Sequence, residues 1–208
     1  MTAATLVSSL RIVLAPLFVV FYVLPLRGAV PDLTAIILLW VILALVEISD
    51  VVDGRLARDT KSVTDLGKVY DPFADVIARM TYFTCFILSG VMPLWTFILI
   101  MYREFAVLFL RMRLTRFKVA LGAKSLGKAK SFTYFLATVV ALAFVTLSRL
   151  DLASTDAVSR WYRGLDVASG VAFSVAAVLS ALSFLDYLRV AIRHERGNRK
   201  DSDEPTDS

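Results

Sequence analysis

The chain has 208 residues, of which 58% are apolar or aromatic and 20% are charged, with a formal net charge of +5. This length suggests one domain, and this apolar content excludes an intrinsically disordered chain. The single cysteine (Cys85) excludes a disulfide framework and a cysteine-cluster metal site, and the single histidine (His194) excludes a histidine-rich metal site.

Six apolar stretches are long enough to cross a membrane as helices, since a spanning helix needs about 20 mostly apolar residues. In chain order they lie at approximately 10–26, 33–52, 71–92, 94–112, 131–149 and 165–188. Each must satisfy its own backbone hydrogen bonds in lipid, which favours helices over strands. The sequence therefore predicts an all-α polytopic membrane protein with six transmembrane helices.

Basic residues are unevenly distributed between the connecting segments. The second and fourth connections and the C-terminal tail carry 16 Lys and Arg residues, whereas the first, third and fifth connections carry 4. Lys and Arg favour the cytoplasmic side of a membrane. We therefore expect both termini in the cytoplasm. These basic residues either set the orientation in the membrane and attract anionic lipid, or they bind an anionic substrate.

The composition changes after residue 188. The segment 189–200 is strongly basic and the segment 201–208 is mostly acidic. We therefore expect a six-helix membrane domain at 1–188 and a cytoplasmic tail at 189–208, whose basic part extends the last helix and whose acidic end is disordered.

Acidic residues flank the second connection. Asp50 and Asp53 lie at the end of the second predicted helix, and Asp71 and Asp75 open the third. Spacings of three and four residues place each pair on one helical face. Because a short loop joins the two helices, the four carboxylates can converge at their cytoplasmic end.

Four neighbouring carboxylates repel one another unless a cation lies between them. Ligand sets made only of oxygen favour Mg²⁺ or Mn²⁺. The alternative is two unrelated pairs at helix ends, since Asp is favoured at a helix N-terminus. That alternative accounts for Asp71 but not for Asp50 and Asp53, which lie near a C-terminus. The pattern therefore favours a metal site.

Small residues and an arginine accompany these carboxylates. Gly54, Ala57 and Gly67 leave room for a bulky ligand close to the backbone, and Arg58 is suited to a phosphate. A divalent metal combined with an arginine is typical of phosphoryl transfer.

These residues together form the pattern D-x2-D-G-x2-A-R-x8-G-x3-D-x3-D without a mismatch, at Asp50, Asp53, Gly54, Ala57, Arg58, Gly67, Asp71 and Asp75. In this pattern the chain resembles the CDP-alcohol phosphatidyltransferase family. The six-helix size and the cytoplasmic placement of the motif also suit that family, so the resemblance covers most of the chain.

The resemblance implies an enzyme that transfers a phosphatidyl-type group from a CDP-linked lipid to an alcohol and releases CMP. It implies two divalent ions, Mg²⁺ or Mn²⁺, held by Asp50, Asp53, Asp71 and Asp75, with Asp75 also the general base. It places the CDP-lipid beside Asp50, Gly54, Ala57, Arg58 and Gly67. A homodimer is implied by the resemblance alone.

The segments M-Y-R-E-F-A-V-L-F-L-R and L-G-K-A-K-S resemble the bacterial phosphatidylglycerophosphate synthase subgroup. That likeness implies a bacterial inner membrane, with the active site facing the cytoplasm, CDP-diacylglycerol as donor and glycerol 3-phosphate as acceptor. The acceptor would be bound by Arg103, Arg111 and Lys128. Arg103 and Arg111 are two helical turns apart on one face, although Arg103 could instead pair with Glu104 or Glu47.

Other functions stay open at this point. Myo-inositol 1-phosphate and serine are competing acceptors. An intramembrane prenyltransferase also uses aspartate clusters, but a second cluster is missing from this sequence. A magnesium transporter would need carboxylates along a pore, whereas here they gather at one side. We expect no nucleic-acid binding, because the basic fourth connection lies against a membrane and has few aromatic residues.

Overall fold

The structure, a computed structural model, describes residues 3–59, 67–116, 125–150 and 156–203. Only the backbone is described at several helix ends, including 50–59, 67–69 and 125–128. The described residues are almost entirely helical. They form α1 (Ala3–Val23), the short 3₁₀ helix η1 (Leu24–Arg27), α2 (Asp32–Asp59), α3 (Gly67–Leu88), α4 (Leu94–Arg116), α5 (Ser125–Arg149) and α6 (Asp156–Asp203).

Turn residues divide the apolar stretches into separate helices. Gly28 closes η1 in the left-handed conformation, with φ of 68°. The third predicted span, 71–92, begins and ends too late, because α3 begins at Gly67 and ends at Leu88, and Gly90 adopts a φ of +73°. A residue with a side chain is strained in that conformation, so the glycine permits the reversal between α3 and α4. Pro93 then precedes α4, and its carbonyl accepts the Thr96 hydroxyl at 2.7 Å.

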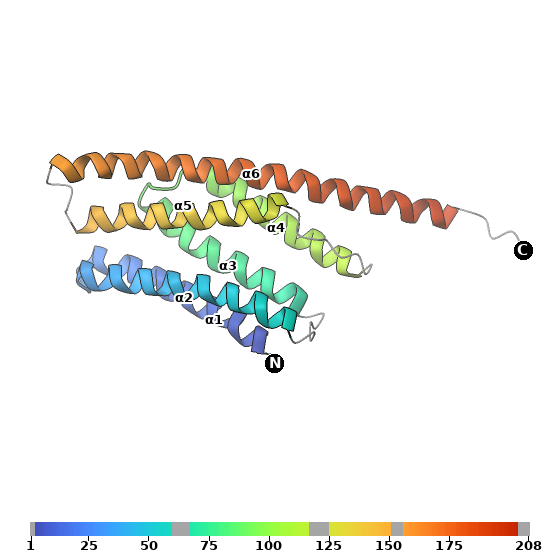
Figure 1. Cartoon of the computed structure of the whole chain (residues 1–208), viewed down its shortest axis with the longest axis horizontal. Helices are drawn as coiled ribbons and strands as arrows, with labels where there is room; N and C mark the ends of the chain where they lie inside the picture. Colours follow the sequence, from blue (N-terminus) through green and yellow to red (C-terminus); the bar gives the residue numbers. More distant parts are fainter. Residues whose placement is uncertain (1–2, 60–66, 117–124, 151–155, 204–208) are drawn as a thin grey trace, which may run out of the picture.

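The helices lie roughly side by side as an elongated bundle (Figure 1). α1 packs against α2 and α3, α5 packs along α6, and α4 lies against α6 and α3. The end of α2, the start of α3, the end of α4 and the start of α5 lie toward the same end of the molecule, on the right in Figure 1. The arrangement therefore brings two predicted functional segments to one end of the bundle. One is the aspartate motif at the end of α2 and the start of α3, and the other is the predicted acceptor segment at the end of α4 and the start of α5.

Aromatic side chains hold the helices together in the core. Phe83 of α3 meets Phe173 of α6 with ring centroids 5.3 Å apart, and Phe18 of α1 lies 5.9 Å from Tyr82 of α3. Small buried residues let α5 and α6 approach closely: Ala137, Ala141, Ala176 and Ala177 are almost fully buried. Close packing through small residues is typical of helices that associate in lipid.

Among the described residues, four helical segments are long and apolar enough to cross a membrane: Ser8–Arg27, Asp32–Ser49, Ala129–Arg149 and Trp161–Arg189. These four correspond to the first, second, fifth and sixth predicted spans. The third and fourth predicted spans lie in α3 and α4, whose apolar runs are interrupted by Asp71, Asp75, Arg79, Arg103, Glu104 and Arg111. The helical class and a membrane location are therefore supported, and the count of six spans stays a prediction.

α6 is much longer than its predicted span of 165–188. It continues to Asp203 and extends past the ends of the other helices (Figure 1). The predicted division at residue 188 therefore falls inside one continuous helix, and the basic part of the predicted tail is helical as expected.

Candidate active site

The predicted donor motif lies at the junction of α2 and α3. Asp50, Asp53, Gly54, Ala57 and Arg58 occupy the last turns of α2, and Gly67 is the first residue of α3. The side chains of these residues lie outside the described part of the structure. Their backbones place them at the end of the bundle that also holds Asp71 and Asp75.

The carboxylates of Asp71 and Asp75 lie one turn apart near the start of α3 and are both half-buried. Ser8 of α1 donates a hydrogen bond to Asp71 Oδ1 at 2.7 Å. A second contact between the same helices joins the hydroxyls of Ser9 and Tyr70 at 2.8 Å. The N-terminal helix therefore fixes the side chain of Asp71 in place.

Two guanidinium groups face the carboxylate of Asp75. Arg79, one turn further along α3, donates to Asp75 Oδ1 at 2.8 Å. Arg11 of α1 approaches the same oxygen at 3.9 Å and is only 2% exposed. Asp75 is thus held from two helices by two buried arginines.

The described carboxylates suit a hard cation. Asp71 and Asp75 offer oxygen ligands on one helical face beside a hydroxyl donor, and oxygen ligands are those that Mg²⁺ and Mn²⁺ prefer. Within the described ranges no group of three or more His, Cys, Asp or Glu residues comes together. The other two predicted ligands, Asp50 and Asp53, belong to the segment for which only the backbone is described.

A second polar cluster surrounds Glu104 of α4, which is 5% exposed. Its Oε1 accepts hydrogen bonds from Arg103 at 3.0 Å, from Tyr134 at 2.9 Å and from Lys130. The Tyr134 hydroxyl also lies 2.7 Å from the Ser180 hydroxyl. This Glu104 cluster joins α4, α5 and α6, and it realises the pairing of Arg103 with Glu104 that the sequence left as an alternative.

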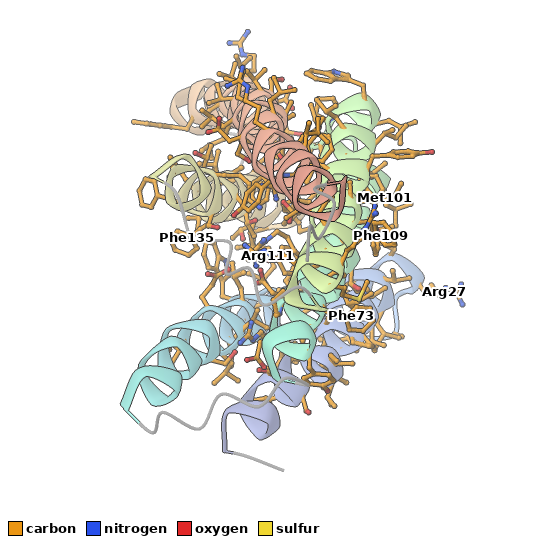
Figure 2. All side chains as sticks on the ribbon, turned by 90° about the vertical axis from the view of Figure 1, so that its right-hand side faces the viewer. Arg27, Phe73, Met101, Phe109, Arg111 and Phe135 are labelled. Atoms are coloured by element: carbon orange, nitrogen blue, oxygen red, sulfur yellow. The ribbon has the colours of Figure 1, made fainter. Side chains whose placement is uncertain are left out.

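Arg103 and Arg111 meet the same aromatic ring. The guanidinium carbons lie 5.5 Å and 5.7 Å from the centroid of Tyr187 of α6, and Arg111 donates to the Tyr187 hydroxyl at 3.1 Å. Arg103 also donates to Ser183 at 2.7 Å. Figure 2 views the bundle from the end that holds the start of α3. Arg111 lies in the middle of the helices, whereas Phe109 and Phe135 lie at the outside of the bundle. The two arginines thus face the interior together, as their spacing predicts.

Lys128, the third predicted acceptor residue, lies near the start of α5, and its side chain is outside the described part. Lys130 of the same G-K-x-K segment is 6% exposed and bound to Glu104. The structure thus assigns the second lysine of this segment to the buried cluster.

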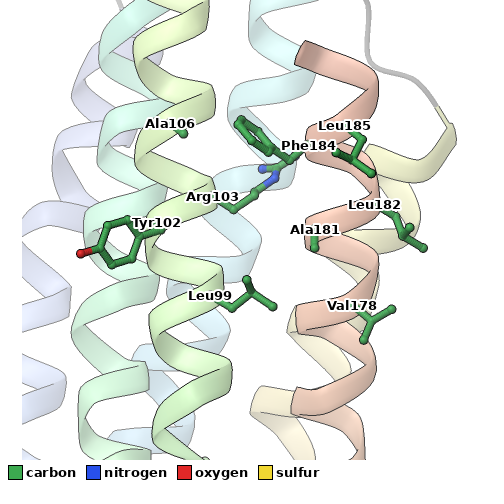
Figure 3. A pocket seen from close by; sticks show the side chains of 9 residues that line it. All are labelled: Leu99, Tyr102, Arg103, Ala106, Val178, Ala181, Leu182, Phe184 and Leu185. Atoms are coloured by element: carbon green, nitrogen blue, oxygen red, sulfur yellow. The ribbon is translucent and has the colours of Figure 1, made fainter. Parts of the chain in front are cut away.

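An apolar groove of about 530 Å³ lies between α4 and α6 (Figure 3). Leu99, Ala106, Val178, Leu182 and Leu185 are among the residues that line it. Arg103 contributes to its wall while its guanidinium contacts Glu104 and Ser183. The charged cluster is therefore bordered by apolar surface.

Sequence reasoning missed Arg79, Tyr134 and the buried role of Lys130. The signal for Arg79 was present, because it is the only charged residue between Asp75 and Arg103. An isolated charge inside a predicted membrane helix usually faces a cavity or a partner. Tyr134 carries no comparable signal, since a tyrosine in an apolar helix is ordinarily part of the core.

The sequence of this chain is similar to those of a known family and of several known proteins. The sequence model of the family described as CDP-alcohol phosphatidyltransferase matches residues 1–182. A CDP-diacylglycerol–glycerol-3-phosphate 3-phosphatidyltransferase of Treponema pallidum (strain Nichols) is 36% identical over 141 residues, which cover 68% of this chain and 63% of the relative. The match thus spans less than two thirds of the length of that relative.

Two further relatives have related names. A probable phosphatidylglycerophosphate synthase of Mycobacterium tuberculosis (strain ATCC 25618 / H37Rv) is 30% identical over 199 residues, covering 95% of this chain and 85% of the relative. A cardiolipin synthase (CMP-forming) of Streptomyces coelicolor (strain ATCC BAA-471 / A3(2) / M145) is 31% identical over 104 residues, covering 50% and 47%.

Proposed function

The chain belongs to the CDP-alcohol phosphatidyltransferase family, and we propose that it transfers the phosphatidyl group of CDP-diacylglycerol to glycerol 3-phosphate. The products are phosphatidylglycerophosphate and CMP. The observation that carries this proposal is the naming of relatives that match most of the chain. The Treponema relative is named as a CDP-diacylglycerol–glycerol-3-phosphate 3-phosphatidyltransferase, and the Mycobacterium relative as a probable phosphatidylglycerophosphate synthase.

The donor site in this proposal is the α2–α3 junction. Asp50, Asp53, Asp71 and Asp75 hold two divalent ions, Mg²⁺ or Mn²⁺. When bound, the ions neutralise the diphosphate and stabilise the charge that develops on the leaving group. The CDP moiety is bound by Asp50 together with Gly54, Ala57, Arg58 and Gly67.

The acceptor site lies toward α4 and α5. Arg103, Arg111 and Lys128 bind the phosphate of glycerol 3-phosphate, with Arg103 keeping its contact with Glu104, because several cations on one wall are needed to hold a dianion at a membrane surface. The convergence of Arg103 and Arg111 on Tyr187 supports this assignment. Arginine presents a planar fork of donors that suits phosphate oxygens.

The reaction is a single displacement at phosphorus. A hydroxyl oxygen of glycerol 3-phosphate attacks the phosphorus that bears the diacylglycerol, the bond from this phosphorus to the CMP oxygen breaks, and Asp75 takes the hydroxyl proton. Asp75 lies one helical turn beyond Asp71 near the start of α3, beside the proposed metal ligands, which supports its assignment as the base.

The proposed location is a bacterial inner membrane, with the site facing the cytoplasm. The six spans follow from the apolar stretches, and the distribution of basic residues places both termini inside. In this proposal residues 1–188 form the membrane domain and 189–208 the cytoplasmic tail, and the working unit is a homodimer.

An acceptor panel tests the proposed activity. The purified full chain is mixed with CDP-diacylglycerol and Mg²⁺, and CMP release is measured with glycerol 3-phosphate, myo-inositol 1-phosphate, serine or phosphatidylglycerol. We expect glycerol 3-phosphate to be used with the highest kcat/KM, and the Asp71→Asn variant provides the blank. Preference for another acceptor would overturn the acceptor assignment alone, whereas no CMP release with any acceptor would overturn the activity.

A further inference from the structure

Arg79 is a buried charge inside α3 that the proposed reaction does not use. It is 9% exposed and lies one helical turn beyond Asp75. Ionisable residues within membrane helices are costly and usually have a specific partner or task. We therefore expect Arg79 to have a specific partner or task.

One side of Arg79 faces the proposed base. Its guanidinium donates to Asp75 Oδ1 at 2.8 Å, and the four-residue spacing fixes the two side chains on the same face of α3. This contact orients the carboxylate, because a planar guanidinium constrains both the distance and the direction of its acceptor.

The other side of Arg79 faces the Glu104 cluster. Its guanidinium carbon lies 5.1 Å from the ring centroid of Tyr134, within the range of a cation–π contact. The Tyr134 hydroxyl is fixed in turn by Glu104 at 2.9 Å and by Ser180 at 2.7 Å. Glu104 also holds Arg103, one of the proposed acceptor residues.

We propose that Arg79 is a positioning residue that holds the carboxylate of Asp75 in a fixed place relative to the acceptor-binding Arg103. A continuous series of contacts runs from Asp75 through Arg79, Tyr134 and Glu104 to Arg103. The series crosses α3, α5 and α4 and so couples the proposed donor and acceptor halves of the site. This inference rests on the proposed function, in which Asp75 accepts the proton.

Arg149 offers a matched control. It also covers a tyrosine ring, with its guanidinium carbon 4.5 Å from the centroid of Tyr22, and it donates to the Tyr22 carbonyl at 2.6 Å. It ends α5, at the opposite end of the bundle from Asp75. Replacing Arg149 therefore removes an arginine–tyrosine contact without touching the proposed site.

The experiment compares Arg79→Gln, Arg79→Lys and Arg149→Gln in the full chain, using CMP release and the midpoint of thermal unfolding. Residues that orient a reacting group typically change activity about 10- to 100-fold when lost. We expect Arg79→Gln to lower kcat by this factor while changing the KM for either substrate less than about twofold, because uniform binding is retained. Arg79→Lys should recover part of kcat, since it keeps the charge but not the fork.

Arg149→Gln should lower the unfolding midpoint and leave kcat unchanged. If Arg79→Gln does not fold, Tyr134→Leu, which removes the ring beneath Arg79, should produce the same selective loss of kcat. The inference is wrong if the folded Arg79 variants keep the wild-type kcat, or if the whole effect is on acceptor KM. The rate of the wild type tests the proposed function separately. Each variant is then assayed with the acceptor that the wild type uses.

Discussion

Asp71 tests the metal site at the scale of a single residue. Asp71→Asn should abolish turnover without unfolding the chain, because the amide oxygen can still accept the 2.7 Å hydrogen bond from Ser8 while the ligand charge is lost. Loss of metal stabilisation costs several kcal/mol of barrier. CMP release and thermal unfolding measure the two effects, and EDTA should inactivate the wild type until Mg²⁺ or Mn²⁺ is restored.

Asp186→Asn is the control for this substitution. Asp186 lies on α6 in an ion pair with the exposed Arg189 at 3.5 Å, and such surface pairs contribute little. The activity of Asp186→Asn should match that of the wild type. Substantial turnover by Asp71→Asn would remove Asp71 from the proposed ligand set.

Arg111 tests the acceptor site. Arg111→Lys should raise the KM for glycerol 3-phosphate while leaving the KM for CDP-diacylglycerol nearly unchanged, because lysine cannot reproduce the bidentate fork. Steady-state rates at varied concentrations of each substrate measure this split. Arg113→Lys, at an exposed position on the same helix, should change neither KM. An unchanged acceptor KM in Arg111→Lys would count against a phosphate at this position.

The sequence predicted individual site residues unequally well. The spacing of Arg103 and Arg111 was sufficient to place both on one face, and both meet Tyr187. Their partner on α6 could not be predicted, because no local pattern relates residues 76 to 84 positions apart. The pairing of Arg103 with Glu104 was one of two alternatives, and only the packing of α5 with Lys130 and Tyr134 distinguishes them.

The connection between α3 and α4 depends on Gly90. Gly90→Ala should destabilise the protein by about 1–2 kcal/mol, the cost of a left-handed conformation for a residue with a side chain. No atom lies within 4 Å of an added Cβ, so the effect comes from the backbone alone. The measurement is the midpoint of thermal unfolding, with kcat expected to stay unchanged.

Gly170→Ala is the matched control for Gly90→Ala. Gly170 lies inside α6, and a Cβ there would also meet nothing within 4 Å. Because alanine favours a helix, this substitution should stabilise the protein by about 0.5–1 kcal/mol. Equal effects of the two substitutions would contradict the assignment of backbone strain to Gly90.

The sequence predicted the existence of each helix better than the residues at which it begins and ends. Each of the six predicted spans coincides largely with a described helix, because lipid-facing and buried positions are both apolar. The predicted ends were wrong where a polar segment begins a helix, as in α6 from Asp156, or where a turn lies within an apolar run, as at Gly90. Hydropathy alone does not distinguish these cases, since it does not report backbone conformation.

The distribution of basic residues along the chain predicts the orientation of the protein in the membrane. Cys85 is a buried free thiol, so Cys85→Ala gives a background for labelling. Ala29→Cys, in the exposed connection before α2, should react with an impermeant maleimide in spheroplasts, whereas Arg189→Cys should react in inverted vesicles. The opposite pattern would invert the proposed orientation and place the active site outside.

The Glu104 cluster also has a consequence for how the protein is made. Arg103 and Glu104 leave the ribosome before Lys130 and Tyr134, and Ser180 and Ser183 follow last. A nascent chain that ends before residue 180 therefore holds a charged α4 whose α6 partners have not yet been synthesised. Since incompletely paired charges are costly in lipid, the proposed six-span arrangement implies that α4 becomes stable in the bilayer only after Ser180 and Ser183 of α6 have been translated.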